Sequence, residues 1–296
     1  MVPPAPPTSD DLGRREKKKG LLVRLTVAPA VLAGVLALLH WHDRSGHSLP
    51  TDLLMVVMSA GAAYEAAKML GAGGRPAPSI ALCLLFSAAL AGLGLVSDHD
   101  PAVRGQWRAL LLAAAVLVTF LGHFRAAREG DLGRVFATLF PIVYVGFLYG
   151  LLREIGDGPQ GARLLALSVV AAKGSDIGGW VVGKAVGRHK MIPSVSPGKT
   201  WEGTFGGLAF SVGGALVIQQ VIDYHAYPAS NVLQTSIYAL SLGVAATISG
   251  LTQSALKRRC GVKDSSTLLP EMGGILDMID SLLLAAPVAW LWLLLA

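Results

Sequence analysis

The sequence has few charged residues for its length. Only 15% of its 296 residues are Asp, Glu, Lys or Arg, whereas a soluble domain carries about 25%. Hydrophobic residues make up 53% of the chain, and the mean hydropathy is +0.55. Several apolar stretches reach roughly 20 residues, the length at which a helix crosses the hydrocarbon core of a bilayer. These features exclude an ordinary soluble protein and predict an all-α integral membrane protein.

Cysteine is also scarce, and the positive charge is dispersed. Cys83 and Cys260 are the two cysteines, too few and too far apart for a disulfide framework or a zinc cluster. The formal net charge is +6, but the basic residues fall in short segments between apolar stretches. We therefore expect membrane lipid, and no nucleic acid, as a partner.

The apolar stretches predict a polytopic bundle of about nine transmembrane helices. They cover residues 21–40, 51–70, 78–97, 107–124, 135–152, 162–183, 204–222, 232–252 and 274–296. Residues 1–20, Pro-rich and then basic, are expected to form a disordered cytoplasmic tail, and residues 21–296 a single membrane domain. Several spans are rich in Ala and Gly, which lets helices pack closely and is compatible with a homodimer.

The distribution of Lys and Arg predicts the orientation, because cytoplasmic loops carry an excess of both. With the N-terminus in the cytoplasm, the opposite side holds, of the 25 basic residues, only Arg44, Arg104, Arg108, Arg153 and Arg163. Lys173 falls within a span, and the others fall on the cytoplasmic side. The polar loops 183–203 and 252–274 share that side. We therefore expect a catalytic half at 162–296 that faces the cytoplasm, in the inner (cell) membrane of a bacterium.

Two acidic residues lie at the start of the last span. Asp277 and Asp280 are three residues apart, so their side chains share one face of a helix. Carboxylates at the edge of hydrocarbon are costly and need a cation. One interpretation is a pair of snorkelling or ion-paired acids. The other, which we favour, is a Mg²⁺ site, since oxygen ligands suit this ion and Asp264 and the basic cluster 257–263 lie close in sequence.

Gly273 and Gly274 precede this span and suggest a place for an anion. Glycine lets backbone amides approach a ligand closely, and the start of the following helix presents its positive end. A loop-to-helix turn without a ligand would use the same residues. The glycine pair therefore leaves both interpretations open.

A charged pair lies inside the sixth predicted span. Lys173 and Asp176 are three residues apart, and ionisable residues within a membrane helix are rare and usually functional. The alternative is a structural ion pair in which the two charges neutralise each other. Either arrangement would place a cation and an anion at the same level of the bilayer.

The loop before residue 204 carries a third set of candidate residues. They are Ser196, Lys199, Thr200 and Glu202. The Gly-Lys-Thr order is similar to part of a phosphate loop, but the first glycine of that motif is replaced by Pro193. Lys199 and the hydroxyl groups could hold a phosphate or a lipid headgroup. Alternatively, the loop is an interfacial segment anchored by Trp201.

The C-terminal part of the chain resembles the phosphatidate cytidylyltransferases, which are also called CDP-diacylglycerol synthases. The signature of that family is matched at Ser254, Lys257, Arg258, Lys263, Asp264, Ser266, Leu269, Pro270, Gly273, Gly274, Ile275, Asp277 and Asp280. The segments SDIGGWVVGK and SPGKTWEG are similar to two further motifs of the family. The resemblance extends from about Arg24 and is strongest after Lys173.

Four positions depart from the family pattern. Met272 stands where the family has His, and Met278 where it has Arg. Gly250 and Gln253 stand where the family has Asp and Glu. The resemblance implies that the family's Asp at the position of Gly250 helps to hold metal. Metal binding in this chain is therefore expected to differ. The chain is identified as a divergent member that keeps the chemistry.

The resemblance implies transfer of a cytidylyl group from CTP to phosphatidate, giving CDP-diacylglycerol and pyrophosphate with the help of Mg²⁺. It implies metal ligation by Asp277, Asp280 and Asp264, and catalytic roles for these three residues and Lys263. Pyrophosphate is expected at Lys257, Arg258 and Lys263, and the lipid phosphate at Lys173 and Lys199. The other expected substrate contacts are Asp176, Ser196, Thr200, Glu202, Gly273 and Gly274.

Two other functions remain open from the sequence. One is cytidylyl transfer to a different lipid phosphate, which would use the same reacting groups and a different lateral lipid pocket. The other is a catalytically impaired protein that binds nucleotide or lipid. The residues in favour of the second are Gly250, Gln253, Met272 and Met278.

Overall fold

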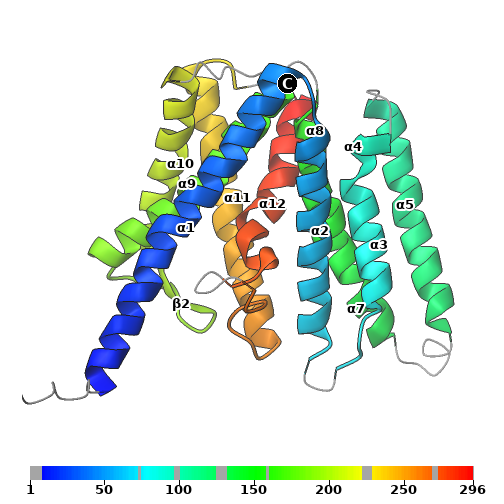
Figure 1. The fold of residues 1–296 in the computed structure, drawn as a ribbon, viewed down its shortest axis with the longest axis horizontal. Coiled ribbons are helices and arrows are strands. Elements are labelled where there is room, and N and C mark those ends of the chain that lie inside the picture. Colours follow the sequence, from blue (N-terminus) through cyan, green and yellow to red (C-terminus); the bar gives the residue numbers. More distant parts are fainter. Residues whose placement is uncertain are drawn as a thin grey trace, which may run out of the picture.

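A computed structural model describes residues 9–72, 75–96, 101–124, 132–157, 160–221, 229–268 and 273–295. These residues form a helical bundle with one short β-hairpin (Figure 1). In chain order the elements are α1 (Ser9–Ser45), α2 (Leu49–Leu70), α3 (Ile80–Ala91), α4 (Leu93–Val96), α5 (Pro101–Gly122), α7 (Gly133–Pro141), the π-helix η1 (Ile142–Phe147), α8 (Leu148–Ile155), α9 (Gly161–Val186), β1 (Lys190–Ile192), β2 (Ser196–Thr200), α10 (Trp201–Val221), α11 (Val232–Arg259) and α12 (Ile275–Leu295). The all-α polytopic architecture expected from the sequence is confirmed.

Within the described part of the chain, seven helices are long and apolar enough to cross a membrane. They are Leu49–Leu70, Ala102–Gly122, Gly133–Ile155, Gly161–Val186, Trp201–Gln220, Val232–Arg259 and Ile275–Leu295. The other two predicted spans correspond to α1 and to α3 with α4. Helix α3 has 12 residues and is shorter than a span of about 20 residues requires. The structure therefore supports seven spans by these criteria and leaves the count of about nine as a prediction.

Helix α1 begins at Ser9, inside the segment expected to be a disordered tail. The described part of that segment, residues 9–20, continues directly into the apolar part of the helix. Lys, Arg, Glu and Leu, which are common in this stretch, favour helices over extended chain. Residues 1–8 of the expected tail lie outside the described residues.

Small residues bring α9 and α10 into close contact. A Cβ atom added at Gly174 would lie 2.9 Å from the carbonyl oxygen of Phe210, and one added at Gly207 would lie 2.5 Å from that of Ser175. Such close approach of backbones is typical of helix pairs in lipid. Helix α9 also packs against α11 and α12, so it forms the centre of the C-terminal half.

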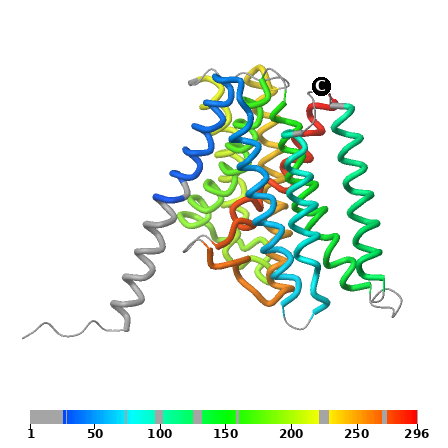
Figure 2. The backbone as a smooth tube through the Cα atoms, turned by 45° about the vertical axis from the view of Figure 1, so that its right-hand side comes forward, coloured from blue at the N-terminus to red at the C-terminus, as the bar shows by residue number. Residues whose placement is uncertain are grey.

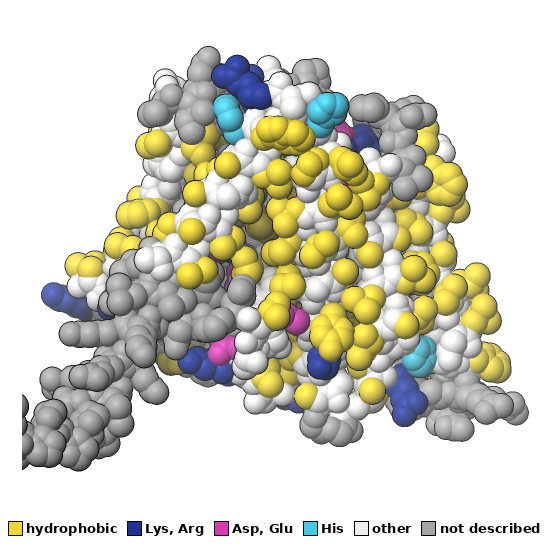
Figure 3. Space-filling view, in the orientation of Figure 1, with side chains coloured by type: hydrophobic (Ala, Val, Ile, Leu, Met, Phe, Trp, Pro, Cys, Tyr) yellow, Lys and Arg dark blue, Asp and Glu magenta, His cyan; other side chains and the backbone are white. Residues whose placement is uncertain are grey.

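One end of the bundle carries the β-hairpin and the connection from α11 to α12 (Figures 1 and 2). Helix α1 begins at that same end (Figure 1). The C-terminal end of α12 lies at the other end of the bundle. The two polar loops singled out in the sequence are therefore on one face. In Figure 3, acidic and basic side chains lie toward the two ends of the visible face, with hydrophobic side chains between them.

The end of the bundle opposite the hairpin holds a buried ion-pair network. Arg153 of α8 pairs with Asp52 of α2 and with Asp157. Two arginines of α5 complete the network: Arg104 pairs with Asp157, and Arg108 Nη2 lies 2.8 Å from Glu154 Oε1. Charges that the sequence places at this end are thus neutralised inside the protein.

Candidate active site

Charged residues from three helices and the hairpin meet at the hairpin end of the bundle. Lys173 and Asp176 come from α9, Lys199 from β2, Lys257 from α11, and Asp277 and Asp280 from α12. Lys173 Nζ lies 3.3 Å from Asp176 Oδ2 and 3.8 Å from Asp280 Oδ1. The structure therefore brings together sequence-predicted residues that are about a hundred positions apart.

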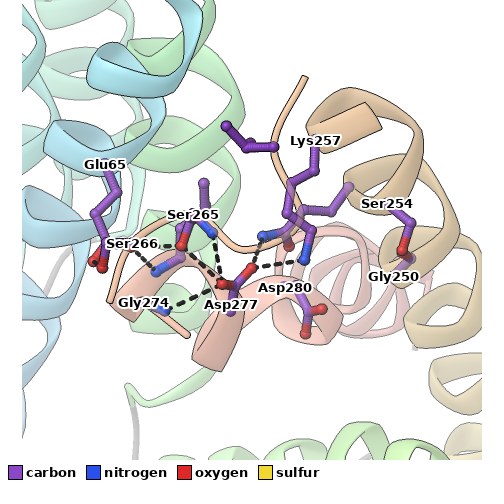
Figure 4. Close-up of polar contacts among 12 residues, drawn as sticks. Glu65, Gly250, Ser254, Lys257, Ser265, Ser266, Gly274, Asp277 and Asp280 are labelled. Atoms are coloured by element: carbon purple, nitrogen blue, oxygen red, sulfur yellow. Dashed lines mark hydrogen bonds and ion pairs between the residues drawn. The ribbon is translucent and has the colours of Figure 1, made fainter. Parts of the chain in front are cut away.

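Both carboxylate oxygens of Asp277 accept hydrogen bonds from neighbouring groups of the protein (Figure 4). Its Oδ1 accepts hydrogen bonds from Lys257 Nζ at 2.9 Å and Gln253 Nε2 at 3.1 Å. Its Oδ2 accepts from Ser265 N at 2.8 Å, Ser265 Oγ at 3.0 Å and Gly274 N at 3.1 Å. A carboxylate offers about four lone-pair sites, and these hydrogen bonds occupy most of them. Asp277 ties α11 and the loop before α12 together.

Glu65 of α2 is a second acid of the site, and its role was not predicted from the sequence. Its side chain accepts hydrogen bonds from the backbone N–H groups of Ile275 at 3.0 Å and Leu276 at 2.9 Å. It also accepts from Ser265 Oγ at 2.9 Å and Ser266 Oγ at 2.7 Å (Figure 4). Glu65 is only 4% exposed. A negative charge at this place caps α12 and interacts favourably with its dipole.

The glycine pair before α12 leaves room for the carboxylates of Asp277 and Glu65. Gly273 has φ +85°, a left-handed conformation that favours glycine, and a Cβ there would collide with the carboxylate of Asp277. A Cβ at Gly274 would collide with the carboxylate of Glu65. These contacts correspond to the loop-to-helix turn that the sequence left open as an alternative, and the substrate anion expected at the glycine pair remains a prediction.

Lys199 reaches the site from the hairpin. Its ammonium donates a hydrogen bond to the carbonyl oxygen of Thr247 at 3.2 Å. A Cβ added at Gly250 would lie 2.9 Å from Lys199 Nζ. Burial lowers the pKa of Lys199, although the charges of Asp176 and Asp280 act in the opposite direction. Lys199 therefore lies near the charged cluster, and its predicted contact with a phosphate remains untested.

The other predicted residues of the hairpin stabilise its fold. Thr200 Oγ1 accepts a hydrogen bond from Gly203 N at 3.1 Å and thereby caps α10. The carboxylate of Glu202 accepts hydrogen bonds from the backbone N–H groups of Arg188 and His189. Ser196 pairs with Ile192 across the hairpin. These contacts correspond to structural roles, so the substrate contacts predicted for the three residues remain untested.

Three residues of the predicted site lie at its exposed edge. Arg258, Lys263 and Asp264 are exposed, and the guanidinium of Arg258 donates to the carbonyl oxygen of Val262. The set Asp264, Asp277 and Asp280 is therefore not gathered as a metal site. Throughout the described ranges, no group of three or more His, Cys, Asp or Glu side chains is placed to hold a metal ion. Since Mg²⁺ is commonly held by one or two carboxylates together with substrate phosphates, the expected Mg²⁺ site remains a prediction.

An apolar cavity of about 320 Å³ leads to the charged cluster. It lies between α1, α2, α8, α9 and α12, with mostly apolar side chains along its walls. Lys173, Asp176 and Asp277 line the same cavity. A mostly apolar pocket with a few convergent polar groups is typical of a ligand site, and this one suits an amphiphile with a charged end.

The sequence was compared with known proteins once this geometry was established. The model of the cytidylyltransferase family matches residues 22–296. The chain belongs to that family. A phosphatidate cytidylyltransferase of Pseudomonas aeruginosa is 34% identical over 230 residues, which cover 70% of this chain and 76% of that protein.

Two other relatives extend the comparison. A phosphatidate cytidylyltransferase of Staphylococcus epidermidis is 33% identical over 204 residues, covering 67% of this chain and 76% of that protein. The uncharacterized protein YnbB of Escherichia coli (strain K12) is 42% identical over 130 residues. That match covers 44% of this chain and 42% of YnbB. The family membership inferred from the sequence motifs is thus confirmed.

Proposed function

We propose that the protein transfers the cytidylyl group of CTP to phosphatidate, releasing pyrophosphate and forming CDP-diacylglycerol. The observation that carries this proposal is the apolar cavity that ends at Lys173, beside Asp176 and Asp280. A lipid phosphate needs such a junction between an apolar space and a cation. The family membership and the two relatives named phosphatidate cytidylyltransferase support the same reaction.

The lipid would lie with acyl carbons in the cavity and its phosphate at Lys173. An oxygen of this phosphate attacks the α-phosphorus of CTP, so a new P–O bond forms. The P–O bond between the α-phosphorus and the bridging oxygen breaks, and pyrophosphate leaves with the electron pair. The nucleophile is already anionic, so the protein's main tasks are positioning and charge stabilisation.

Lysine side chains would stabilise the charge of the polyphosphate. Lys173, Lys199 and Lys257 come from three different elements and reach one cluster. Preorganised cations stabilise charge that develops in a phosphoryl-transfer transition state. Arg258 and Lys263, at the exposed edge, are placed where pyrophosphate would depart toward water. The Mg²⁺ requirement remains a prediction from the resemblance, and none of these steps uses the metal.

We propose that the hairpin end faces the cytoplasm of a bacterium, where CTP is available. The excess of Lys and Arg on that end supports this orientation. Helix α1 and the pair α3–α4 would then complete nine crossings, with the N-terminus inside and the C-terminus outside. Substrate lipid would enter the cavity sideways from the inner leaflet.

A binding protein without turnover is the second candidate function. The hydrogen bonds that Asp277 accepts from Lys257, Gln253, Ser265 N and Gly274 N favour it, since this acid would be needed for metal-assisted transfer. The neutral Gln253 beside Asp277 points the same way. Such a protein would bind CTP or a lipid phosphate and release it unchanged.

An assay of the full chain in lipid nanodiscs separates these functions. It would supply radiolabelled CTP, Mg²⁺ and a panel of lipid phosphates, including phosphatidate and a polyprenyl phosphate. We expect labelled CDP-diacylglycerol. Product only with another lipid phosphate would change the substrate assignment. Binding of CTP by folded protein with no product from any lipid would support the second candidate and contradict the transferase.

A further inference from the structure

The hydroxyl of Ser249 on α11 is hydrogen-bonded to the backbone of α12. It donates to the carbonyl oxygen of Asp280, and it accepts from the backbone nitrogen of Leu284 at 3.4 Å. In a regular α-helix these two backbone groups pair with each other, because each N–H donates to the carbonyl four residues earlier. A fully buried side chain of α11 therefore stands within the hydrogen-bond ladder of α12, an arrangement that bends or opens helices.

Two other groups of α12 depart from the regular pattern nearby. The backbone N–H of Ser281 donates to Asp280 Oδ1 at 2.6 Å, whereas a regular helix would direct it to the carbonyl of Asp277. Pro287 lies further along the same helix and offers no N–H to the carbonyl of Leu283. The turn that carries Asp280 is therefore held by contacts other than those of the helix itself.

This turn places Asp280 at the charged end of the apolar cavity. Asp280 Oδ1 lies 3.8 Å from Lys173 Nζ, and Lys173 lines the cavity. A Cβ built at Gly250, the neighbour of Ser249, would lie 3.9 Å from Asp280 Oδ2. Helix α11 is thus close to Asp280 at two points, at its backbone through Ser249 and at its carboxylate through Gly250 (Figure 4).

We infer that Ser249 is a positioning residue, whose hydroxyl holds this turn of α12 so that the Asp280 carboxylate stays beside Lys173. The inference rests on the proposed function, in which Lys173 binds the lipid phosphate. Without the hydroxyl, the Leu284 N–H can pair with the Asp280 carbonyl, and the turn closes toward a regular helix. The carboxylate then shifts relative to Lys173, and a misplacement of about 1 Å is costly in a site that orients a charged group.

Binding of phosphatidate to the full chain tests this role without turnover. In nanodiscs of zwitterionic lipid, displacement of a fluorescent phosphatidate would give the dissociation constant. Ser249→Ala should weaken phosphatidate binding roughly tenfold. Ser211→Ala is the matched control, because the hydroxyl of Ser211 is equally buried and lies 2.7 Å and 2.8 Å from carbonyl oxygens of α9 and α11. Unchanged binding in Ser249→Ala, or an equal loss in both variants, would overturn the inference.

A double-mutant cycle shows whether Ser249 acts through Asp280. Once Asp280→Asn has removed the carboxylate charge, Ser249→Ala should weaken phosphatidate binding by less than about twofold more, because the group that it positions is gone. The same tenfold loss in both backgrounds would mean that Ser249 acts independently of Asp280, which contradicts the inference.

Amide exchange at Leu284 tests the helix geometry without any substrate. Hydrogen exchange resolved by NMR would follow this N–H in the wild type and in Ser249→Ala. Exchange should become slower in the variant, because a bond to the Asp280 carbonyl replaces the 3.4 Å bond to the hydroxyl. A general loosening of the structure would make exchange faster instead. Faster or unchanged exchange would therefore overturn the inference.

The exchange measurement separates this inference from the proposed function. If the wild type binds no phosphatidate, the proposed function fails, while exchange at Leu284 still decides the role of Ser249. If Ser249→Ala does not fold, Ser249→Cys takes its place, since it keeps nearly the same shape and has a weaker donor. It should change binding and exchange in the same directions, and wild-type values for both would overturn the inference.

Discussion

The carboxylate of Glu65 caps the helix that begins at Ile275, with an oxygen 3.0 Å from that residue's backbone nitrogen. The two residues are 210 positions apart in the chain. This contact joins α2 to the start of α12 and holds the serines of the preceding loop. The N-terminal half therefore contributes directly to the geometry of a site whose charged cluster comes from the C-terminal half.

The first prediction concerns this cap. Glu65→Gln should lower the free energy of unfolding by about 1–3 kcal/mol. The change replaces one carboxylate oxygen, an acceptor, by an NH₂ group, which is a donor. Backbone N–H groups at the start of α12 would then lose an acceptor. Thermal unfolding in detergent would measure this loss. Glu65→Asp should recover part of it by restoring the charge. Asp264→Asn, at an exposed position, serves as the control, and a loss as large as that of Glu65→Gln would contradict the capping role.

The second prediction concerns Asp277. Asp277→Asn should reduce stability by about 3 kcal/mol, because Lys257 is left without its partner in a mostly buried place. Calorimetry of the purified protein would show the loss. The double variant Lys257→Met/Asp277→Asn should be more stable than Asp277→Asn alone, since the unpaired charge is removed. A single variant with the thermal stability of wild type would show that Asp277 does not hold the loop.

Lys173 supplies the third prediction, which follows from the proposed transfer reaction. Lys173→Met should raise the KM for phosphatidate roughly tenfold or more, the usual effect of losing a hydrogen bond to a charged group. The KM for CTP should change less, because the lysine faces the apolar cavity. Lys190→Met is the matched control. A larger effect on CTP than on phosphatidate would assign Lys173 to the nucleotide.

The fourth prediction concerns the apolar cavity. Met55→Trp would fill part of its 320 Å³, so activity with long-chain phosphatidate should fall several-fold by steric exclusion. Activity with a dihexanoyl substrate should fall less. Leu110→Trp on α5, at a position that is 58% exposed, controls for the added ring. An equal loss with both substrates would indicate that acyl chains do not use this cavity.

Much of the helical arrangement could be predicted from apolar length. The spans expected at 51–70, 162–183 and 232–252 coincide closely with α2, α9 and α11, because one helix of about 20 apolar residues satisfies its own backbone in lipid. The end of α3 at Ala91 was not predicted, since Gly92 interrupts a stretch that is apolar on both sides. The strands of the hairpin were also missed, because three and five residues give little periodicity.

The site was predicted in part for a similar reason. Charges in membrane segments need partners, and on that ground the sequence predicted the pairing of Lys173 with Asp176. The contact of Lys173 with Asp280 was not predicted. The same rule applies to Glu65, but its partners lie about 200 positions away, and no local spacing identifies them. The hydrogen bonds of Asp277 could not be predicted because they depend on how the loop folds back, and its role as a metal ligand stays a prediction. The proximity of Lys199 to Gly250 likewise exists only in three dimensions.

The arginine network at the opposite end has a consequence for biogenesis. Asp52 of α2 and Arg104 of α5 find their counter-charges in Arg153 and Asp157, which come later in the chain, so they are matched only after these helices have come together. Arg153 also pairs with Asp157, four residues further on. A nascent helix that carried one of these groups alone would enter the bilayer with an unmatched ion, which is unfavourable. Insertion and helix association are therefore coupled for these three segments, and truncation after α5 should leave an intermediate that quality-control proteases recognise.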